Sequence, residues 1–339
     1  MAITFPWNDA VVEATRDITP TVREFTLLPA IGALPYAPGA HLEVQLPVQG
    51  RLQTRRYSLV GAPEGRTYRI AVKRIAEGRG GSLAMWQLQV GDHLQLRSPQ
   101  NKFALAPNAP AYLLVAGGIG VTPLVFMAQT LVARGAQVRM LLAARTPAEL
   151  AYADVLRVAL GGSLQTFTDA DGQRPDIPAE ITALPPGSHL LCCGPAGMLD
   201  AVRSAWRALQ RPDADLRFET FGSSGRLAPQ AFGLHIPRHG LSTTVAADCS
   251  LLDAIELAGI QTLSHCRRGE CGLCAMDVIS VDGEIDHRDV FLSQHEKQAN
   301  QRICVCVSRV VGQITLDSAF RGDTLGGGAS CQAIAKQYN

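Results

Sequence analysis

The chain has 339 residues, of which 47% are hydrophobic and 18% are charged, and its formal net charge is +1. This length predicts two or three domains, and the balanced charge indicates neither a nucleic acid nor an anionic membrane as partner. The nine cysteines, without a basic and apolar signal peptide over residues 1–9, indicate thiols and metal ligands in a cytoplasmic protein rather than disulfides. No apolar stretch is long enough to span a membrane.

The first segment, residues 1–106, contains short runs in which apolar and polar residues alternate, with Pro and Gly between them. These runs cover residues 22–27, 41–46 and 67–73. The pattern is typical of antiparallel strands that close into a small barrel.

Two motifs in this segment predict a binding site for a phosphate-bearing ligand. Arg55, Tyr57 and Ser58 offer a guanidinium, an aromatic ring and a hydroxyl on one extended stretch. Further on, glycines surround Arg79 and precede Ser82, where we expect a helix over 83–88 to begin. Exposed backbone amides and the helix dipole favour an anion at such a start.

The middle segment, residues 107–221, alternates buried strands with helices, which predicts a doubly wound parallel sheet. The expected strands are 112–116, 138–144, 164–168, 189–193 and 216–221, and the expected helices are 123–134, 148–159 and 198–210. Ligands bind such sheets at the carboxyl ends of strands. Two turns lie there, one formed by Gly117, Gly118, Ile119 and Gly120, and the other by Cys193, Gly194 and Pro195. The first is not the standard G-x-G-x-x-G fingerprint, and Cys193 suits either a core position or a dinucleotide contact.

The last segment carries a cysteine motif. Cys266, Cys271 and Cys274 follow the spacing C-x4-C-x2-C, and Cys304 and Cys306 come later. This spacing with one distant cysteine is that of a plant-type [2Fe–2S] cluster, whereas zinc sites usually show two C-x2-C pairs. Strand alternation does not choose between Cys304 and Cys306, since residues i and i+2 share a face; the shorter spacing slightly favours Cys304.

Around that motif we expect a linker over 222–231, strands at 232–236 and 241–246, a helix at 251–258, and a weakly patterned tail over 321–339. The stretch of Asp286, His287, Arg288 and Asp289 is expected to be a polar turn before a helix rather than a second metal site.

Taken in order, these motifs resemble the ferredoxin–NADP reductase superfamily, and in particular reductases of the phthalate dioxygenase reductase type, among them vanillate demethylase reductases. The resemblance covers residues 10 to about 317. It rests on R-x-Y-S-L at 55–59, A-V-K-R at 71–74, G-R-G-G-S at 78–82, G-G-I-G-x-T-P at 117–123, C-G-P at 193–195, F-E-x-F-G at 218–222, the cysteine loop, D-H-R-D at 286–289 and C-V-S-R at 306–309.

The resemblance implies a multidomain protein that uses FMN, NADH and a [2Fe–2S] cluster. Its parts would be an antiparallel β-barrel flavin domain (1–106), a doubly wound α/β nucleotide domain (107–221), the linker, a C-terminal α+β domain of the β-grasp ferredoxin type (232–320), and the tail.

The resemblance also implies roles for individual residues. The residues that would meet the flavin and its phosphate are Arg55, Tyr57, Ser58, Ala71, Val72, Lys73, Arg79, Gly81, Ser82 and Phe221. Those that would meet the nucleotide are Gly117, Gly118, Gly120, Thr122, Cys193, Gly194 and Pro195, with Ser58, Thr122 and Cys193 at the reacting groups. Cys306 would be the fourth cluster ligand, because it begins the C-V-S-R match. Arg56 departs from the family, where smaller residues often occur.

The expected function is that of an NADH-dependent reductase. A hydride from NADH reaches the flavin, and single electrons pass through the cluster to a separate Rieske-type oxygenase. Arg79 in a Gly-rich helix start suits the terminal phosphate of FMN, and the lone Arg145 after the second nucleotide-domain strand favours NADH over NADPH. One alternative is a non-enzymatic iron–sulfur binding or sensor protein, which would not need the nucleotide turns. Another is the electron-transfer subunit of a different iron–sulfur flavoenzyme complex, in which the third and fourth cysteines lie close together.

Overall fold

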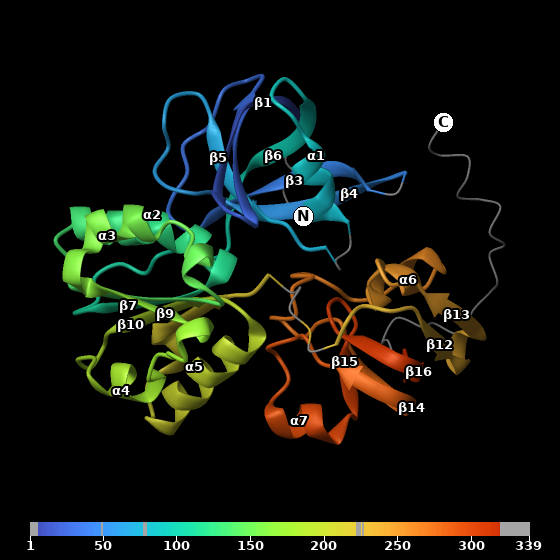
Figure 1. The fold of residues 1–339 in the computed structure, drawn as a ribbon. Helices are drawn as coiled ribbons and strands as arrows, with labels where there is room; N and C mark the ends of the chain where they lie inside the picture. The colour runs from blue at the N-terminus through green and yellow to red at the C-terminus, as the bar shows by residue number, and fades with distance from the viewer. Residues whose placement is uncertain (1–5, 49, 77–79, 222–224, 226, 319–339) are drawn as a thin grey trace.

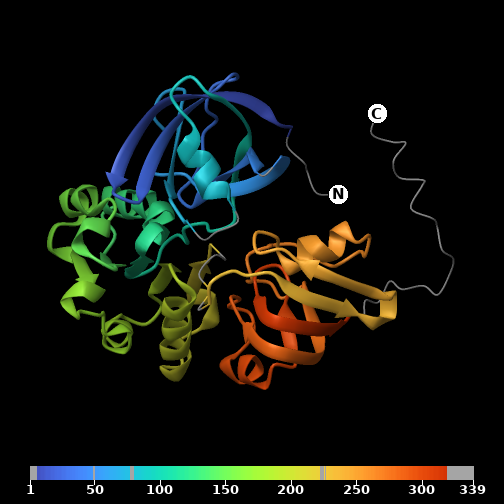
Figure 2. The ribbon, with the colours of Figure 1, turned by 45° about the vertical axis from the view of Figure 1, so that its right-hand side comes forward.

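The computed structural model describes residues 6–48, 50–76, 80–221, 225 and 227–318, and builds them around three separate sheets. Each sheet lies within one of the three domain ranges expected from the sequence. Figures 1 and 2 show the barrel, drawn in blue and cyan, above the green and yellow α/β domain, with the orange and red C-terminal domain beside the α/β domain. Arg79 and the tail lie outside the described residues.

The first sheet is an antiparallel barrel of six strands in the order β4-β3-β6-β1-β2-β5. A bridge between Leu59 and Ile70 joins its two ends, and apolar side chains such as Phe25, Leu42 and Tyr68 fill the interior. Its elements are β1 (Asn8–Thr19), β2 (Val22–Pro29), β3 (Ala40–Val48), β4 (Arg51–Ser58), β5 (Tyr68–Lys73), α1 (Gly81–Gln87) and β6 (His93–Asn101).

The second sheet is parallel throughout, in the order β11-β10-β7-β8-β9. Helices α2 and α3 cover one face and α4 and α5 the other (Figure 1). The elements are β7 (Tyr112–Gly117), α2 (Val121–Ala133), β8 (Val138–Ala144), α3 (Ala153–Leu160), β9 (Leu164–Thr168), α4 (Ile177–Thr182), β10 (His189–Cys193), α5 (Ala196–Ala208) and β11 (Leu216–Glu219). Short 3-10 segments are η1 (Gly118–Gly120), η2 (Pro147–Glu149), η3 (Gly161–Ser163), η4 (Asp169–Asp171), η5 (Asp213–Asp215) and, in the last domain, η6 (Pro237–His239).

The third sheet is mixed, in the order β13-β12-β16-β14-β15. Strands β12 and β16 are parallel, and the other neighbours are antiparallel. Ser250 caps α6 through the amide of Asp253. The elements are β12 (Phe232–Ile236), β13 (Leu241–Val245), α6 (Leu251–Leu257), β14 (Ala275–Asp286), α7 (Gln294–Ala299), β15 (Arg302–Cys304) and β16 (Arg309–Asp317).

The helix expected over 148–159 is interrupted. Residues 147–149 form η2, and α3 begins only at Ala153, after Tyr152 adopts a φ of 59°. The Tyr152 hydroxyl donates to Glu24 Oε2 at 2.9 Å, so a contact with the barrel accompanies the break. The strand expected to reach 221 ends at Glu219. None of the helices in the described part of the chain is long and apolar enough to cross a membrane.

Candidate functional site

The residues predicted to meet a flavin surround one cavity of about 190 Å³ between the three domains. Strands β4 and β5, the start of α1, the start of α2 and the segment after β11 each contribute to its wall. The predicted residues that line it are Arg55, Tyr57, Ser58, Ala71, Val72, Lys73, Gly81, Ser82, Thr122 and Phe221. Cys306 lines it from the C-terminal domain, so a ligand there would contact all three parts of the chain.

A larger cleft of about 1210 Å³ lies between the barrel and the C-terminal domain. Arg55, Ser58, Phe221 and Cys306 line both spaces. At the start of α1, Arg55 and the Ser82 hydroxyl form the cationic end of the cavity, and Phe221 adds an aromatic ring from the segment after β11. This lining suits a planar ligand that carries a phosphate.

At the cationic end, Arg55 lies directly against Gly81. A Cβ atom at Gly81 would lie 2.3 Å from Arg55 Nε, so a side chain there would displace the guanidinium. The Ser82 hydroxyl accepts a hydrogen bond from the Ile75 amide at 3.1 Å. These contacts fit a phosphate site at the start of α1, to which the sequence also assigned Arg79.

On the side of the α/β domain, the two predicted turns meet backbone to backbone. A Cβ atom at Gly117 would lie 2.5 Å from Pro195 Cδ, and one at Gly194 would lie 3.1 Å from the Gly117 nitrogen. The Thr122 hydroxyl donates to the Ile119 carbonyl at 2.9 Å, which holds this turn at the start of α2.

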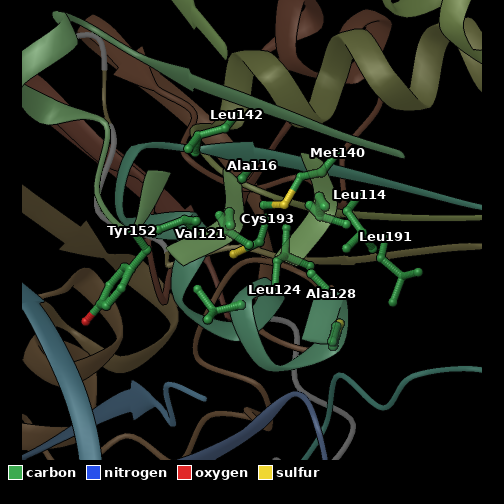
Figure 3. Packing of buried hydrophobic residues seen from close by; sticks show 14 of the residues in the cluster. Leu114, Ala116, Val121, Leu124, Ala128, Met140, Leu142, Tyr152, Leu191 and Cys193 are labelled. Carbon is green, nitrogen blue, oxygen red and sulfur yellow. The ribbon is translucent and has the colours of Figure 1, made fainter. Parts of the chain in front are cut away.

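Cys193 is fully buried, and its side chain packs among Leu114, Val121 and Leu124 (Figure 3). Burial raises its pKa well above the usual thiol value, and the nearby Glu219 raises it further. The neutral thiol is therefore suited to packing and not to nucleophilic chemistry. Its predicted contact with a nicotinamide stays a prediction.

The cysteine loop brings thiols together from distant parts of the chain. Cys266, Cys274 and Cys306 are at most 6% exposed, while Cys271 is partly exposed. Hydrogen bonds from the Cys306 thiol and from backbone amides lower the pKa of Cys266 to about 4. Hydrogen bonds from Cys304 and Cys306 lower that of Cys274 to about 3. The same hydrogen bonds raise the pKa of the two donors, Cys304 and Cys306. The arrangement therefore favours the thiolate, which is the form that ligates iron, at Cys266 and Cys274.

The loop backbone is also shaped around the first cysteine. The amides of Arg268 and Glu270 both donate to Cys266 Sγ at 3.4 Å. Gly269 has a φ of +75° and packs against Asp289 too closely for a side chain. No three His, Cys, Asp or Glu side chains in the described ranges converge as they would around a single metal ion. A [2Fe–2S] cluster needs no such convergence, because its four cysteines are shared between two irons.

Cys304 and Cys306 have different surroundings. Cys306 hydrogen-bonds with both Cys266 and Cys274 and lines both the cavity and the cleft. Cys304 belongs to β15, where it pairs with Ala275, and its thiol hydrogen-bonds with Cys274. Both thiols are buried in the core of the C-terminal domain, but Cys306 is the one that contacts two cysteines of the loop and reaches the cavity. This difference supports Cys306 as the fourth ligand.

Sequence reasoning missed the ion pairs that hold the loop. Arg268 pairs with the buried Glu219 at the end of β11 and with Glu270 at 2.9 Å. Glu270 in turn accepts the Thr220 amide at 2.8 Å, next to Phe221. Arg267, by contrast, pairs with Asp253 and Glu256 at the exposed surface. The sequence gives no local signal that separates Arg267 from Arg268, because their partners are distant in the chain.

Asp286, His287, Arg288 and Asp289 lie at the end of β14 and before α7, as predicted, and form a buried polar support. Arg288 pairs with Asp286 at 2.7 Å, and Asp289 accepts the Leu292 amide at 2.8 Å. The Val290 amide donates to the Gly269 carbonyl at 2.9 Å. This segment therefore braces the cysteine loop.

Two family models match the chain. Residues 9–105 match the oxidoreductase FAD-binding domain, and residues 234–311 match the 2Fe-2S iron-sulfur cluster binding domain. The chain is 36% identical to the heme-dependent oxidative N-demethylase beta subunit of Ectopseudomonas mendocina (strain ymp), over 91% of this chain and 98% of the relative. It is 35% identical to the phthalate 4,5-dioxygenase oxygenase reductase subunit of Pseudomonas putida, over 84% of this chain and 86% of the relative.

Among solved structures, the chain is similar to phthalate dioxygenase reductase, described as a modular structure for electron transfer from pyridine nucleotides to [2Fe-2S]. The TM-score is 0.72 and the identity 32%, over 92% of this chain and 98% of the solved one. The match confirms the expected order of a β flavin domain, an α/β nucleotide domain and a ferredoxin domain. The chain therefore belongs to the flavin- and [2Fe–2S]-dependent reductase subunits of oxygenase systems, of the phthalate dioxygenase reductase type.

Proposed function

We propose that this reductase oxidises NADH, holds FMN as its flavin, and delivers single electrons through a [2Fe–2S] cluster to a separate Rieske-type oxygenase. One observation carries the proposal. The cavity lined by the predicted flavin residues is also lined by Thr122 of the nucleotide domain and by Cys306 of the ferredoxin domain. A flavin there would lie between its electron donor and its electron acceptor.

The chain's own residues supply binding and orientation. Arg55, with Arg79, Gly81 and Ser82, would hold the phosphate, and Tyr57 and Ser58 would contact the flavin and its ribityl chain. Burial raises the pKa of Tyr57, so its hydroxyl stays protonated and can donate a hydrogen bond. Ala71, Val72 and Lys73 would follow the ring edge, and Phe221 would cover the ring. When bound, the flavin would accept a hydride and release single electrons.

Lys73 is itself held from the nucleotide domain. Its ammonium lies 3.6 Å from Glu149, and Thr21 also donates to that carboxylate. These contacts tie the end of β5, which would meet the flavin, to the segment before α3. They would hold the barrel and the nucleotide domain in one orientation beside the flavin ring.

FMN is favoured over FAD because the cationic end of the cavity suits a terminal phosphate monoester. Arg55 and Gly81 lie there, and Arg79 precedes Gly81 by two positions in the sequence. FAD, which the matching family description names, would continue to an adenosine and require a further docking surface. It is the competing outcome of the test below.

NADH is favoured over NADPH because few cations follow β8. Arg145 is the basic residue of that turn, and the Ala170 amide donates to its carbonyl at 2.9 Å. This bond places the η4 turn, with Asp169 and Asp171, beside it. Carboxylates there would disfavour a 2′-phosphate.

The test combines a visible spectrum with identification of the flavin. Purified protein is titrated with NADH without oxygen, and the released flavin is identified by chromatography. We expect flavin and cluster bleaching, stoichiometric FMN, and a higher kcat/KM with NADH than with NADPH. Stoichiometric FAD would overturn the FMN assignment, and equal efficiencies would overturn the nucleotide preference. Absence of NADH oxidation would favour an iron–sulfur binding protein instead.

The oxygenase step needs its own assay. Reduced protein is mixed with a purified Rieske-type oxygenase, and oxidation of the reductase cluster is followed spectroscopically. Electron transfer that survives removal of the reductase cluster would contradict the proposed route.

A further inference from the structure

Three charged residues form a row across neighbouring barrel strands. Glu43 on β3 lies opposite Arg56 on β4 and opposite Arg97 on β6. Arg56 Nε and Nη2 both donate to Glu43 Oε1, at 2.9 and 2.8 Å, and Arg97 Nη1 donates to Glu43 Oε2 at 3.0 Å. The carboxylate therefore has an arginine on each side.

Glu43 stays ionised in this row. Burial raises its pKa, but the hydrogen bonds from Arg56 and Arg97 outweigh burial, and the pKa lies below its usual value. Its side chain is 8% exposed, against 28% for Arg56. A buried carboxylate fixed by two arginines gives the Arg56 guanidinium one defined orientation.

The remaining arm of Arg56 leaves the barrel. Its Nη1 donates to the main-chain carbonyl of Cys266 at 3.0 Å. Cys266 opens the cysteine loop of the ferredoxin domain, and Arg56 lines the flavin cavity together with the residues on either side of it. A single side chain therefore joins the strand next to the flavin cavity to the backbone of a cluster ligand.

We propose that Arg56 is a positioning residue for electron transfer, which clamps the cluster loop to the flavin barrel through the Cys266 carbonyl. The proposal rests on the proposed function for the identity of the two redox groups. Arg56 neither gains nor loses an electron or a proton. It shortens and fixes the gap between the domains, and its positive charge beside the loop favours the cluster state with one more electron.

This clamp acts on a different side of the loop from the contacts described above. Arg268 and Glu270 tie the loop to Glu219 and Thr220 of the nucleotide domain, whereas Arg56 ties it to the barrel. Loss of Arg56 should therefore loosen the barrel contact while the nucleotide-domain contacts keep the loop folded.

Arg97 provides a matched control. It donates to the same carboxylate from the opposite side, and each single arginine variant leaves Glu43 with one partner. The experiment compares Arg56→Met and Arg97→Met with the unmodified full-length protein. Flavin content and iron content are measured first, and the rate of flavin bleaching by NADH second. The rate of electron transfer from flavin to cluster and the reduction potential of the cluster are measured last.

Arg56→Met should keep its flavin, its cluster and its flavin bleaching rate, because the three guanidinium nitrogens of Arg56 bond to Glu43 and Cys266. Its flavin-to-cluster rate should fall about tenfold, because the arrangement that holds the cluster loop against the barrel loses one hydrogen bond to a charged group and becomes less populated. Its cluster potential should shift to a more negative value. Arg97→Met should leave both quantities within twofold of the unmodified protein. Arg56→Lys keeps the positive charge but lacks the several donors of a guanidinium. It should restore the cluster reduction potential more fully than the flavin-to-cluster rate.

Small-angle X-ray scattering adds a readout independent of activity. Arg56→Met should show a larger radius of gyration than Arg97→Met, and the gap should widen as salt is added. Equal transfer rates, potentials and radii in the two variants would overturn the clamp. Failure of the proposed function would instead appear in the unmodified protein, as missing NADH-driven bleaching, and would leave the scattering comparison intact.

Discussion

Gly120 and Cys193 touch through their backbones: a Cβ atom at Gly120 would lie 2.1 Å from the carbonyl oxygen of Cys193. Gly120 ends the turn between β7 and α2, and Cys193 ends β10; β7 and β10 are neighbouring parallel strands. The glycine allows the two turns that are predicted to bind the nucleotide to close on each other at the edge of the sheet.

Gly120→Ala should therefore separate the two turns. The added methyl group meets main-chain atoms, which have little freedom to move, so we expect a loss of ~1–3 kcal/mol in the free energy of unfolding. The KM for NADH should rise as well. Urea unfolding and steady-state kinetics measure the two effects.

Gly162→Ala is the control, because a Cβ atom there meets nothing within 4 Å. It should change neither the unfolding free energy by more than a few tenths of a kcal/mol nor the KM. A Gly120→Ala protein with unchanged KM would show that the close contact serves only folding.

Arg55→Met should weaken flavin binding while the ferredoxin domain stays loaded. Arg55 lines the cavity and lies against Gly81 at its cationic end. Loss of a charge-assisted bond to a phosphate should lower flavin affinity about tenfold to a hundredfold. Flavin retained after gel filtration, measured against iron content, gives the result. Arg66→Met removes an exposed arginine of the same barrel and should retain flavin fully; equal losses in both proteins would point to a general charge effect.

Much of the flavin cavity could be predicted because its residues lie in short motifs at strand ends. The family resemblance assigned R-x-Y-S and A-V-K to the flavin, and the structure places them on β4 and β5, where both motifs line the cavity. The parallel sheet was equally accessible, since β7 is buried along its whole length and reads as a continuous apolar run.

The parts that were missed lack a local signal. Strand β1 has five successive exposed residues and two register irregularities, so alternation disappears from its sequence. Strand β14 is likewise exposed at half of its positions. The contact between Arg56 and Cys266 joins residues 210 positions apart, and no spacing rule reaches that far. In the sequence, Arg56 stands out only because smaller residues often occur at this position in the family.

Cys306→Ala should abolish the cluster, whereas Cys304→Ala should keep it. The Cys306 thiol hydrogen-bonds with both Cys266 and Cys274 and lines the cavity, while Cys304 hydrogen-bonds with Cys274 from its place in β15. Iron content and the paramagnetic resonance signal of the reduced protein are the measurements. Cys304→Ala should cost only ~1 kcal/mol in unfolding free energy, as a small buried deletion does. Retention of the signal in Cys306→Ala and its loss in Cys304→Ala would identify Cys304 as the ligand.

His41 introduces an acid sensitivity at the same interdomain cleft. It is 2% exposed, and neither ring nitrogen has a hydrogen-bond partner among the described residues. Burial, with the nearby charges of Arg268, Arg56 and Lys102, lowers its pKa to about 4 from the ordinary 6.5. Between those values the unfolded chain binds a proton that the folded protein excludes.

The sign of the effect follows from that difference. Stability from a group with a lowered folded pKa is fully present above the unfolded pKa and decreases as pH falls toward the folded one. Between pH 7.5 and pH 5, His41 should cost the unmodified protein ~2 kcal/mol of unfolding free energy. His41→Leu fills the site without a titrating ring and should show a flatter pH profile, measured by urea unfolding at each pH. His295→Leu, which removes an exposed imidazole on α7, controls for the loss of a histidine as such. Parallel profiles for His41→Leu and the unmodified protein would show that His41 is protonated in the folded protein as readily as in the unfolded chain.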